Sequence, residues 1–137
     1  MAKLTVDGCS RGNPGMAAFG GTLWDHRGVV LTAFGSFLGY KPILYAELMV
    51  VCEGLELGYS MLEVESDSAT VVSWIHNQGP VRWEYSYSLR WVCRLVMSLP
   101  IQVRHVLREA TSAADFLANW ACTHQTSRCF FILSGAS

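Results

Sequence analysis

The most informative stretch of this 137-residue chain is Asp7-Gly8-Cys9-Ser10-Arg11-Gly12-Asn13-Pro14-Gly15. It follows a segment in which Leu4 and Val6 alternate with polar side chains, a period of two that predicts a strand over residues 3–7. Glycine, serine, asparagine and proline dominate the remainder, as is typical of turns. The stretch therefore predicts a strand that ends at Asp7 and a turn over residues 8–15.

The rest of the sequence predicts alternating strands and helices. Residues 18–24 and 29–38 have the character of strands, and the loop between them, residues 25–28, suits a hairpin. Further strands are expected over 62–65 and 101–106, and helices over 43–57, 69–75, 85–98 and 112–123. The order βββαβααβα indicates an α/β fold whose first three strands form an antiparallel meander.

Composition restricts the domain organisation and the function. Hydrophobic residues make up 51% of the chain and charged residues 15%, so the chain buries a large core and fits one domain. We place this domain at residues 1–125. An apolar tail at 126–137 either packs on the core or joins further sequence of a longer polypeptide. The net charge of −1 weighs against binding nucleic acid through bulk electrostatics.

The cysteines and the hydropathy pattern favour an intracellular, reducing compartment. No pair among the five cysteines has the CxxC spacing, which argues against a zinc site or a disulfide framework. No apolar run reaches the ~18 residues of a membrane span, and no signal-peptide pattern opens the sequence. We therefore expect free thiols in a monomeric protein of the nucleus or cytoplasm, with no membrane partner and no secretion.

Four carboxylates stand where the predicted elements begin, end or face the sheet: Asp7, Glu47, Asp67 and Asp115. This placement predicts that they meet at one end of the sheet. Converging carboxylates persist when a cation lies between them, and their oxygens favour Mg²⁺ or Mn²⁺. Two such ions about 4 Å apart can hold the attacking and the leaving oxygen of a phosphodiester. The pattern therefore predicts two-metal phosphoryl transfer.

Each carboxylate also has a purely structural interpretation. Asp7 suits a turn, Asp67 suits a helix N-cap, and Asp115 suits a capping box with Ser112. Glu47 is the hardest to explain in this way, because it interrupts an otherwise apolar helix stripe. The four structural interpretations weaken together, because all four residues also match one family pattern.

Four segments, in order, resemble the motifs of the type 1 ribonuclease H family: Asp7–Gly15, Ala46-Glu47-Leu48, Glu65-Ser66-Asp67-Ser68 and the block from His105 to Ala118. The last block is most similar to plant ribonuclease H-like domains of the reverse-transcriptase-like, retroelement type. The resemblance covers residues 2–121. It implies the ribonuclease H fold, a five-stranded mixed sheet with the first three strands antiparallel and helices on both faces.

The resemblance also implies an activity, the metal-dependent cleavage of the RNA strand of an RNA/DNA hybrid that leaves a 3′-hydroxyl and a 5′-phosphate. It implies that the four carboxylates hold two Mg²⁺ ions, or Mn²⁺ in their place. Contacts to the substrate are expected from Gly8, Cys9, Ser10, Asn13, Gly15 and Lys41. Asn13 suits either a contact to a ribose 2′-hydroxyl or a tight turn.

Two residues compete for a role that the family gives to a histidine near the last helix, which assists the attacking water or product release. His105 alternates with its neighbours as part of the fifth predicted strand, whereas Arg108 lies beyond that strand in a flexible segment. An arginine cannot act as a base near neutral pH, but it can neutralise a phosphate. We favour Arg108 for the catalytic role, although a surface pair with Glu109 is its alternative.

The middle of the chain departs from the family, which often carries a basic protrusion there. Residues 74–91 hold only Arg82 and Arg90 and no lysine, and we expect Trp74 and Trp83 to pack in the core rather than stack on bases. An alternative function is therefore a catalytically weak or inactive domain that binds nucleic acid or protein. A third function, a cysteine hydrolase that uses Cys9 or Cys52, has no supporting signature.

Overall fold

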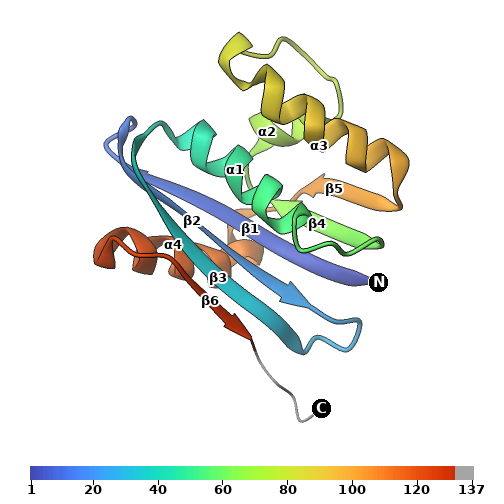
Figure 1. Cartoon of the computed structure of the whole chain (residues 1–137), viewed down its shortest axis with the longest axis horizontal. Helices are drawn as coiled ribbons and strands as arrows, with labels where there is room; N and C mark the ends of the chain where they lie inside the picture. Colours follow the sequence, from blue (N-terminus) through green and yellow to red (C-terminus); the bar gives the residue numbers. More distant parts are fainter. Residues whose placement is uncertain (132–137) are drawn as a thin grey trace.

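The computed structural model describes residues 1–131 as a mixed sheet with helices on both faces (Figure 1). The sheet has six strands in the order β5-β4-β1-β2-β3-β6. Their bounds are β1 (Ala2–Arg11), β2 (Gly15–Trp24), β3 (Val30–Lys41), β4 (Leu62–Ser66), β5 (Ile101–His105) and β6 (Arg128–Phe131). The antiparallel meander of β1, β2 and β3 is confirmed, and β4 and β5 run parallel to β1.

Four α-helices cover the sheet: α1 (Ile43–Leu55), α2 (Ala69–Ile75), α3 (Ser86–Ser98) and α4 (Ser112–His124). Short 3₁₀ turns precede two of them, at Trp83–Tyr85 and at Arg108–Thr111. Figure 1 shows α1, α2 and α3 on one face of the sheet and α4 alone on the other. None of the helices over residues 1–131 is both long enough and apolar enough to cross a membrane.

The prediction of five strands is wrong, because β6 pairs antiparallel with β3 from Gly35↔Arg128 to Thr32↔Phe131. The pairing gives hydrogen-bond partners to an edge of β3 that would otherwise be exposed. The chain reverses after α4 at Gln125, which has a φ of 49°. Phe130 then packs edge-on against Trp120. The start of the apolar tail thus packs on the domain, and residues 132–137 lie outside the described part of the chain.

The predicted end of β1 at Asp7 is also wrong. The ladder with β2 continues from Gly8↔Phe19 to Arg11↔Met16, so that the turn is confined to three residues. Gly15 closes this turn, because a Cβ atom there would lie 1.8 Å from the carbonyl oxygen of Arg11. Pairing with β2 therefore overrides the turn-like composition of the segment after Asp7.

The main core lies between the sheet and the layer of α1, α2 and α3. Leu4 and Val6 of β1 pack in it, as the alternating pattern predicts. At Gly54 a Cβ atom would lie 2.1 Å from Cδ2 of Leu4, so this glycine lets α1 lie close to the sheet. Because α1 lies close to β1, a side chain on its inner face can reach the residues of β1.

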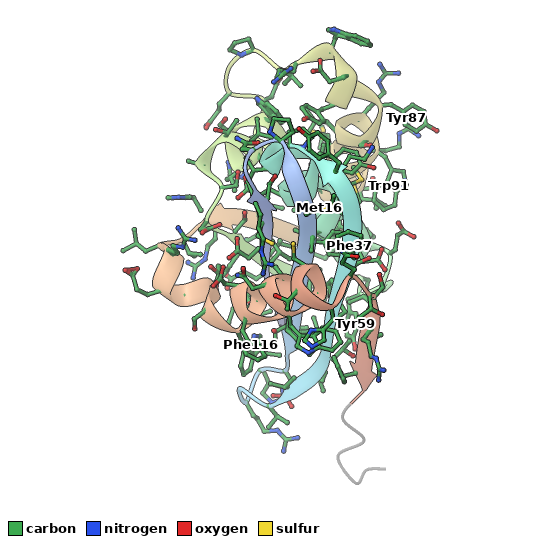
Figure 2. The ribbon with its side chains drawn as sticks, turned by 90° about the vertical axis from the view of Figure 1, so that its left-hand side faces the viewer. Met16, Phe37, Tyr59, Tyr87, Trp91 and Phe116 are labelled. Carbon is green, nitrogen blue, oxygen red and sulfur yellow. The ribbon has the colours of Figure 1, made fainter. Side chains whose placement is uncertain are left out.

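The two tryptophans for which core packing was expected have different environments. Trp74 is buried and stacks at a tilt on Tyr85. Trp83 is 84% exposed, so the prediction of core packing is wrong there. It precedes α3, whose outer surface also presents the exposed Tyr87 (Figure 2). Tyr85 occupies the inward-facing position of this turn, so Trp83 faces solvent.

Candidate metal centre

The site lies where the parallel pairing of β1 and β4 ends. The last pair of this ladder is Val6 with Ser66, so Asp7, which continues β1, and Asp67, which follows β4, lie next to each other just beyond it. The carboxyl ends of adjacent parallel strands are a common position for ligand sites in α/β proteins. Glu47 joins them from α1: one carboxylate oxygen of each of these three residues lies within 4.8 Å of the other two.

Gly8 accounts for the position of Glu47. A Cβ atom on Gly8 would lie 2.9 Å from both the Cβ of Ala46 and the backbone nitrogen of Glu47. Any side chain at Gly8 would therefore push α1 away from β1. The glycine after Asp7 is the reason that a helix residue and a strand residue can share one ion.

The fourth carboxylate comes from the opposite face of the sheet through a second close approach. Gly20 is the cross-strand partner of Asp7, and a Cβ atom there would lie 2.4 Å from the carbonyl oxygen of Ala114. The first turn of α4 can therefore rest on β2 and place Asp115 beside Asp7. Asp115 lies outside the mutual 4.8 Å group of the other three and contacts that group through Asp7.

Asp7 is the centre of the cluster, and its environment disfavours its own charge. Its side chain is 4% exposed. Burial, and then the charges of Asp67 and Asp115, raise the pKa of Asp7 to about 8. Oδ1 accepts a hydrogen bond from the backbone N–H of Gly8 at 2.9 Å, whereas Oδ2 is buried without a hydrogen-bond partner among the described residues. A cation at Oδ2 would supply the missing partner and favour the ionised form.

Glu47 shows the same tendency more weakly. Burial raises its pKa to about 7, and the charge of Asp67 adds to the rise. A hydrogen bond donated by the Ser68 hydroxyl and the positive charge of Arg108 act in the opposite direction. The cluster consists of carboxylates alone, which are the hard oxygen ligands of Mg²⁺ and Mn²⁺. Together with the unpaired oxygen of Asp7, this donor set fits a divalent cation.

The structural interpretations of Asp67 and Asp115 do not hold. The N-cap of α2 is Ser68, whose Oγ accepts from the backbone N–H of Val71 at 3.3 Å. The N-cap of α4 is Thr111, and no side chain caps this helix, so Ser112 and Asp115 form no capping box. Asp115 instead lies in the first helical turn, where the helix dipole favours a negative charge.

The residues expected to contact substrate have structural roles within the domain. Gly8 lies under α1 and Gly15 closes the turn before β2. The Cys9 thiol donates to the carbonyl oxygen of Ala118 in α4, and the Ser10 hydroxyl donates to that of Lys41 at 2.9 Å. These contacts hold β1 to its neighbours.

Asn13 and Lys41 lie at the start of α1, the helix that carries Glu47. Oδ1 of Asn13 accepts from the backbone N–H of Ile43 at 2.9 Å, so this side chain serves the first turn of α1. The Lys41 ammonium group lies 4.8 Å from the centre of the Tyr45 ring. Contact of the six residues with substrate stays a prediction.

Arg108 and His105 occupy different positions relative to the carboxylates. Arg108 opens the 3₁₀ turn before α4, and its positive charge lowers the pKa of Glu47. His105 is the last residue of β5, as expected, and it pairs in register with Ser66. The charge of Arg108 thus acts on one member of the cluster, and its catalytic role in preference to His105 stays a prediction.

One residue outside the predicted set contacts the cluster, and two cysteines bear on the third candidate function. Asn119 donates to Asp115 from one helical turn further along α4, and the i, i+4 spacing in the sequence is the signal that could have identified it. Burial raises the pKa of Cys9 to about 11 and that of Cys52 to about 12. A cysteine nucleophile needs a lowered pKa, so these values argue against the cysteine hydrolase.

Comparison with known proteins gives consistent matches. A family model described as reverse transcriptase-like matches residues 5–121. An Arabidopsis thaliana protein that bears the name "putative ribonuclease H protein" is 34% identical over 125 residues, which are 87% of this chain and 20% of the relative. The chain thus spans one fifth of the length of that relative.

The fold is similar to that of solved ribonucleases H. LC11-RNase H1, whose crystal structure is a complex with an RNA/DNA hybrid, superposes with a TM-score of 0.83 at 24% identity over 91% of this chain and 99% of that protein. RNase H1 from Halobacterium salinarum superposes with a TM-score of 0.76 at 26% identity, over 91% of this chain and 98% of that protein.

Proposed function

This chain belongs to the reverse transcriptase-like family, and on that premise we propose that it is a metal-dependent endonuclease that hydrolyses the RNA strand of RNA/DNA hybrids. The observation that carries the proposal is the group of Asp7, Glu47 and Asp67, whose carboxylate oxygens lie within 4.8 Å of one another. The hybrid in the LC11-RNase H1 crystal and the name of the Arabidopsis relative support the choice of substrate.

Two Mg²⁺ ions, or Mn²⁺, held by the four carboxylates would activate a water molecule and stabilise the leaving oxygen of the scissile phosphate. In this proposal Asp7 and Asp67 hold the ions at the centre of the site. Asp115 serves the side of the attacking water. Glu47 serves the side of the leaving group, where its carboxylate accepts a hydrogen bond from a ribose 2′-hydroxyl.

Two features of the chain add to the chemistry. The 2′-hydroxyl that Glu47 recognises is absent from DNA, so this contact directs cleavage to the RNA strand. Arg108 neutralises the scissile or the product phosphate, because its guanidinium group stays charged at all working pH values. The products carry a 3′-hydroxyl and a 5′-phosphate.

A weakly active or inactive binding domain is the second candidate, and the charge of the chain favours it. The net charge is −1, and residues 74–91 contain only two arginines. One of these, Arg82, is paired with Glu84 at 2.7 Å. Few phosphates would be neutralised, and hybrid binding would be weak. A longer polypeptide around this domain would supply further binding surface, in the nucleus or the cytoplasm.

The two candidates are separated by a substrate panel with analysis of the product ends. Wild-type protein is incubated with Mg²⁺ and labelled RNA/DNA hybrid, double-stranded RNA, double-stranded DNA or single-stranded RNA. We expect cleavage of the RNA in the hybrid alone, with 5′-phosphate product ends. Binding of the hybrid without any cleavage would favour the second candidate, and cleavage of single-stranded RNA at a similar rate would contradict the proposed specificity.

A further inference from the structure

Asn119 is the side-chain hydrogen-bond donor that engages Asp115 within residues 1–131. It lies four residues after Asp115 on α4, on the same side of the helix. Its Nδ2 donates to Oδ1 of Asp115 at 3.2 Å and to the backbone carbonyl oxygen of Asp115 at 3.0 Å. Both acceptors are oxygens, so the amide must present its NH₂ group to Asp115 and its orientation is fixed by chemistry.

The backbone of Asn119 is itself tied to β1. Nη2 of Arg11 donates to the carbonyl oxygen of Asn119 at 3.3 Å and to Oγ1 of Thr123 at 2.7 Å. Arg11 is the last residue of β1, the strand that carries Asp7. The amide that holds Asp115 is therefore anchored, through the helix backbone, to the strand of the central carboxylate.

This arrangement opposes the electrostatic repulsion in the site. Asp115 lies beside Asp7, and like charges at this distance favour rotation of the more exposed carboxylate toward water. The hydrogen bond from Asn119 engages Oδ1 and limits that rotation. The bond engages Oδ1 alone, so Oδ2 of Asp115 is the oxygen that an ion would bind.

We propose that Asn119 is a positioning residue that holds the Asp115 carboxylate toward Asp7 and so raises the affinity of the site for its divalent ions. This inference rests on the proposed function. Removing a hydrogen-bond partner of a metal-binding side chain typically costs about 10- to 100-fold in metal affinity or activity. Loss of the amide should accordingly raise the half-saturating concentration of Mn²⁺ by about tenfold or more.

The test compares Asn119→Ala, Asn119→Gln and a matched control, Thr123→Ala. Alanine favours helix more than asparagine does, so Asn119→Ala should keep α4 folded. Glutamine at the same position can still donate to Asp115 across one helical turn and should restore part of the metal affinity. Thr123→Ala removes one of the two partners of Arg11 on the same helix, but it leaves the hydrogen bond from Arg11 to the Asn119 carbonyl in place and does not touch the carboxylate.

Metal binding is measured without substrate, as the rise in melting temperature during titration with Mn²⁺. We expect a weaker response for Asn119→Ala, a partial recovery for Asn119→Gln and no change for Thr123→Ala. With hybrid present, kcat at low metal should fall while KM stays constant. In an Asp115→Asn background, Asn119→Ala should add no further loss, because it acts through the carboxylate.

The outcomes separate this inference from the proposed function. If wild-type protein responds to Mn²⁺ and cleaves hybrid, but Asn119→Ala behaves like wild type, the role of Asn119 is refuted and the function stands. An additive loss in the Asp115→Asn background would also refute it. A wild-type protein that neither responds to Mn²⁺ nor cleaves hybrid would overturn the proposed function and this inference with it.

Discussion

Asp7 shows how its surroundings turn an ordinary residue into a candidate ligand. An aspartate followed by a glycine suits a simple turn, and the local sequence does not exclude that interpretation. In the structure the same side chain is buried, has one oxygen without a partner among the described residues and lies beside two further carboxylates. This arrangement is unfavourable unless a cation is present, which is the physical basis for assigning it a function.

Replacing one charge of the cluster tests this basis. Asp67→Asn keeps the size of the side chain and removes a negative charge next to Asp7 and Glu47. We expect no detectable cleavage of hybrid, together with an unchanged or raised melting temperature in EDTA, because repulsion is relieved. Glu56→Gln makes the same kind of change at the exposed end of α1 and should leave both quantities unaltered. Mg²⁺-dependent cleavage by Asp67→Asn at the wild-type rate would refute the assignment.

Single substitutions also test whether Arg108 or His105 has the catalytic role near the last helix. Arg108 acts electrostatically on Glu47, whereas His105 ends β5. Arg108→Ala should lower kcat by about tenfold or more, the effect of one lost charge-assisted contact to phosphate. His105→Ala should have a smaller effect. Turnover is compared in two variants with matching melting curves, and the opposite order would show that His105 carries the role.

At the scale of elements, the site depends on how closely α1 and α4 approach the sheet. Gly8 and Gly54 admit α1, and Gly20 admits the first turn of α4. The approach of α4 at Gly20 could not be predicted from the local sequence, because it depends on which strand lies beneath the helix.

Gly20→Ala tests this dependence. The added Cβ atom would lie 2.4 Å from a backbone oxygen of α4, so the helix must shift. We expect a loss of about 1–3 kcal/mol in the free energy of unfolding, measured by urea denaturation, and a loss of cleavage under conditions where the variant is fully folded.

The control for this prediction is Gly28→Ala in the β2–β3 hairpin. Gly28 has a φ of +82°, and a Cβ atom there would meet no described atom within 4 Å, so the change strains the backbone without touching the site. It should lower stability and leave cleavage per folded molecule unchanged. Equal cleavage by the two folded variants would contradict the role of Gly20.

Most elements were predictable from periodicity, and the errors have physical causes. The turn-like composition after Asp7 suggested an end to the strand, but pairing with β2 extends β1 to Arg11. The short strand β6 carries no alternating pattern that identifies it, and it forms because the edge of β3 is available. The first error arises from pairing across a tight hairpin and the second from pairing between strands distant in sequence, and the composition of a single segment reports neither.

At the scale of the whole molecule, the buried carboxylates link stability to pH. The pKa of Asp7 rises from 3.8 to about 8 on folding, and that of Glu47 rises from 4.5 to about 7. At a pH between the unfolded and the folded pKa of each group, the folded state holds a proton that the unfolded state has lost. The free energy of unfolding therefore falls as pH rises through this interval. We expect this fall between pH 5 and 8 in EDTA, measured by urea denaturation, and a smaller fall in Mg²⁺.

The control for the pH prediction is Asp7→Asn, which removes the group with the larger shift. In EDTA this variant should show a flatter dependence of stability on pH than the wild type. A wild-type protein that becomes more stable from pH 5 to pH 8 in EDTA would contradict the burial of unpaired carboxylates at this site.

The sequence was most informative about the site where several distant residues converge. The expected meeting of Asp7, Glu47 and Asp67 agrees with their separation in the structure, and Asp115 lies beside Asp7. The contribution of Asn119 was missed, because a hydrogen bond within a helix leaves only a spacing in the sequence. The exposure of Trp83 is not predictable from the sequence, because the burial of Tyr85 in the same turn decides which aromatic side chain faces the core.

The most direct test of the central claim, that these carboxylates form one metal-dependent catalytic site, is the rate of RNA-strand hydrolysis in an end-labelled RNA/DNA hybrid. Wild-type protein and Asp7→Asn are assayed in Mg²⁺ and in EDTA. We predict cleavage by the wild type in Mg²⁺ only, and none by Asp7→Asn in either condition. Cleavage that persists in EDTA or in Asp7→Asn, or its absence from the wild type in Mg²⁺, would contradict the claim.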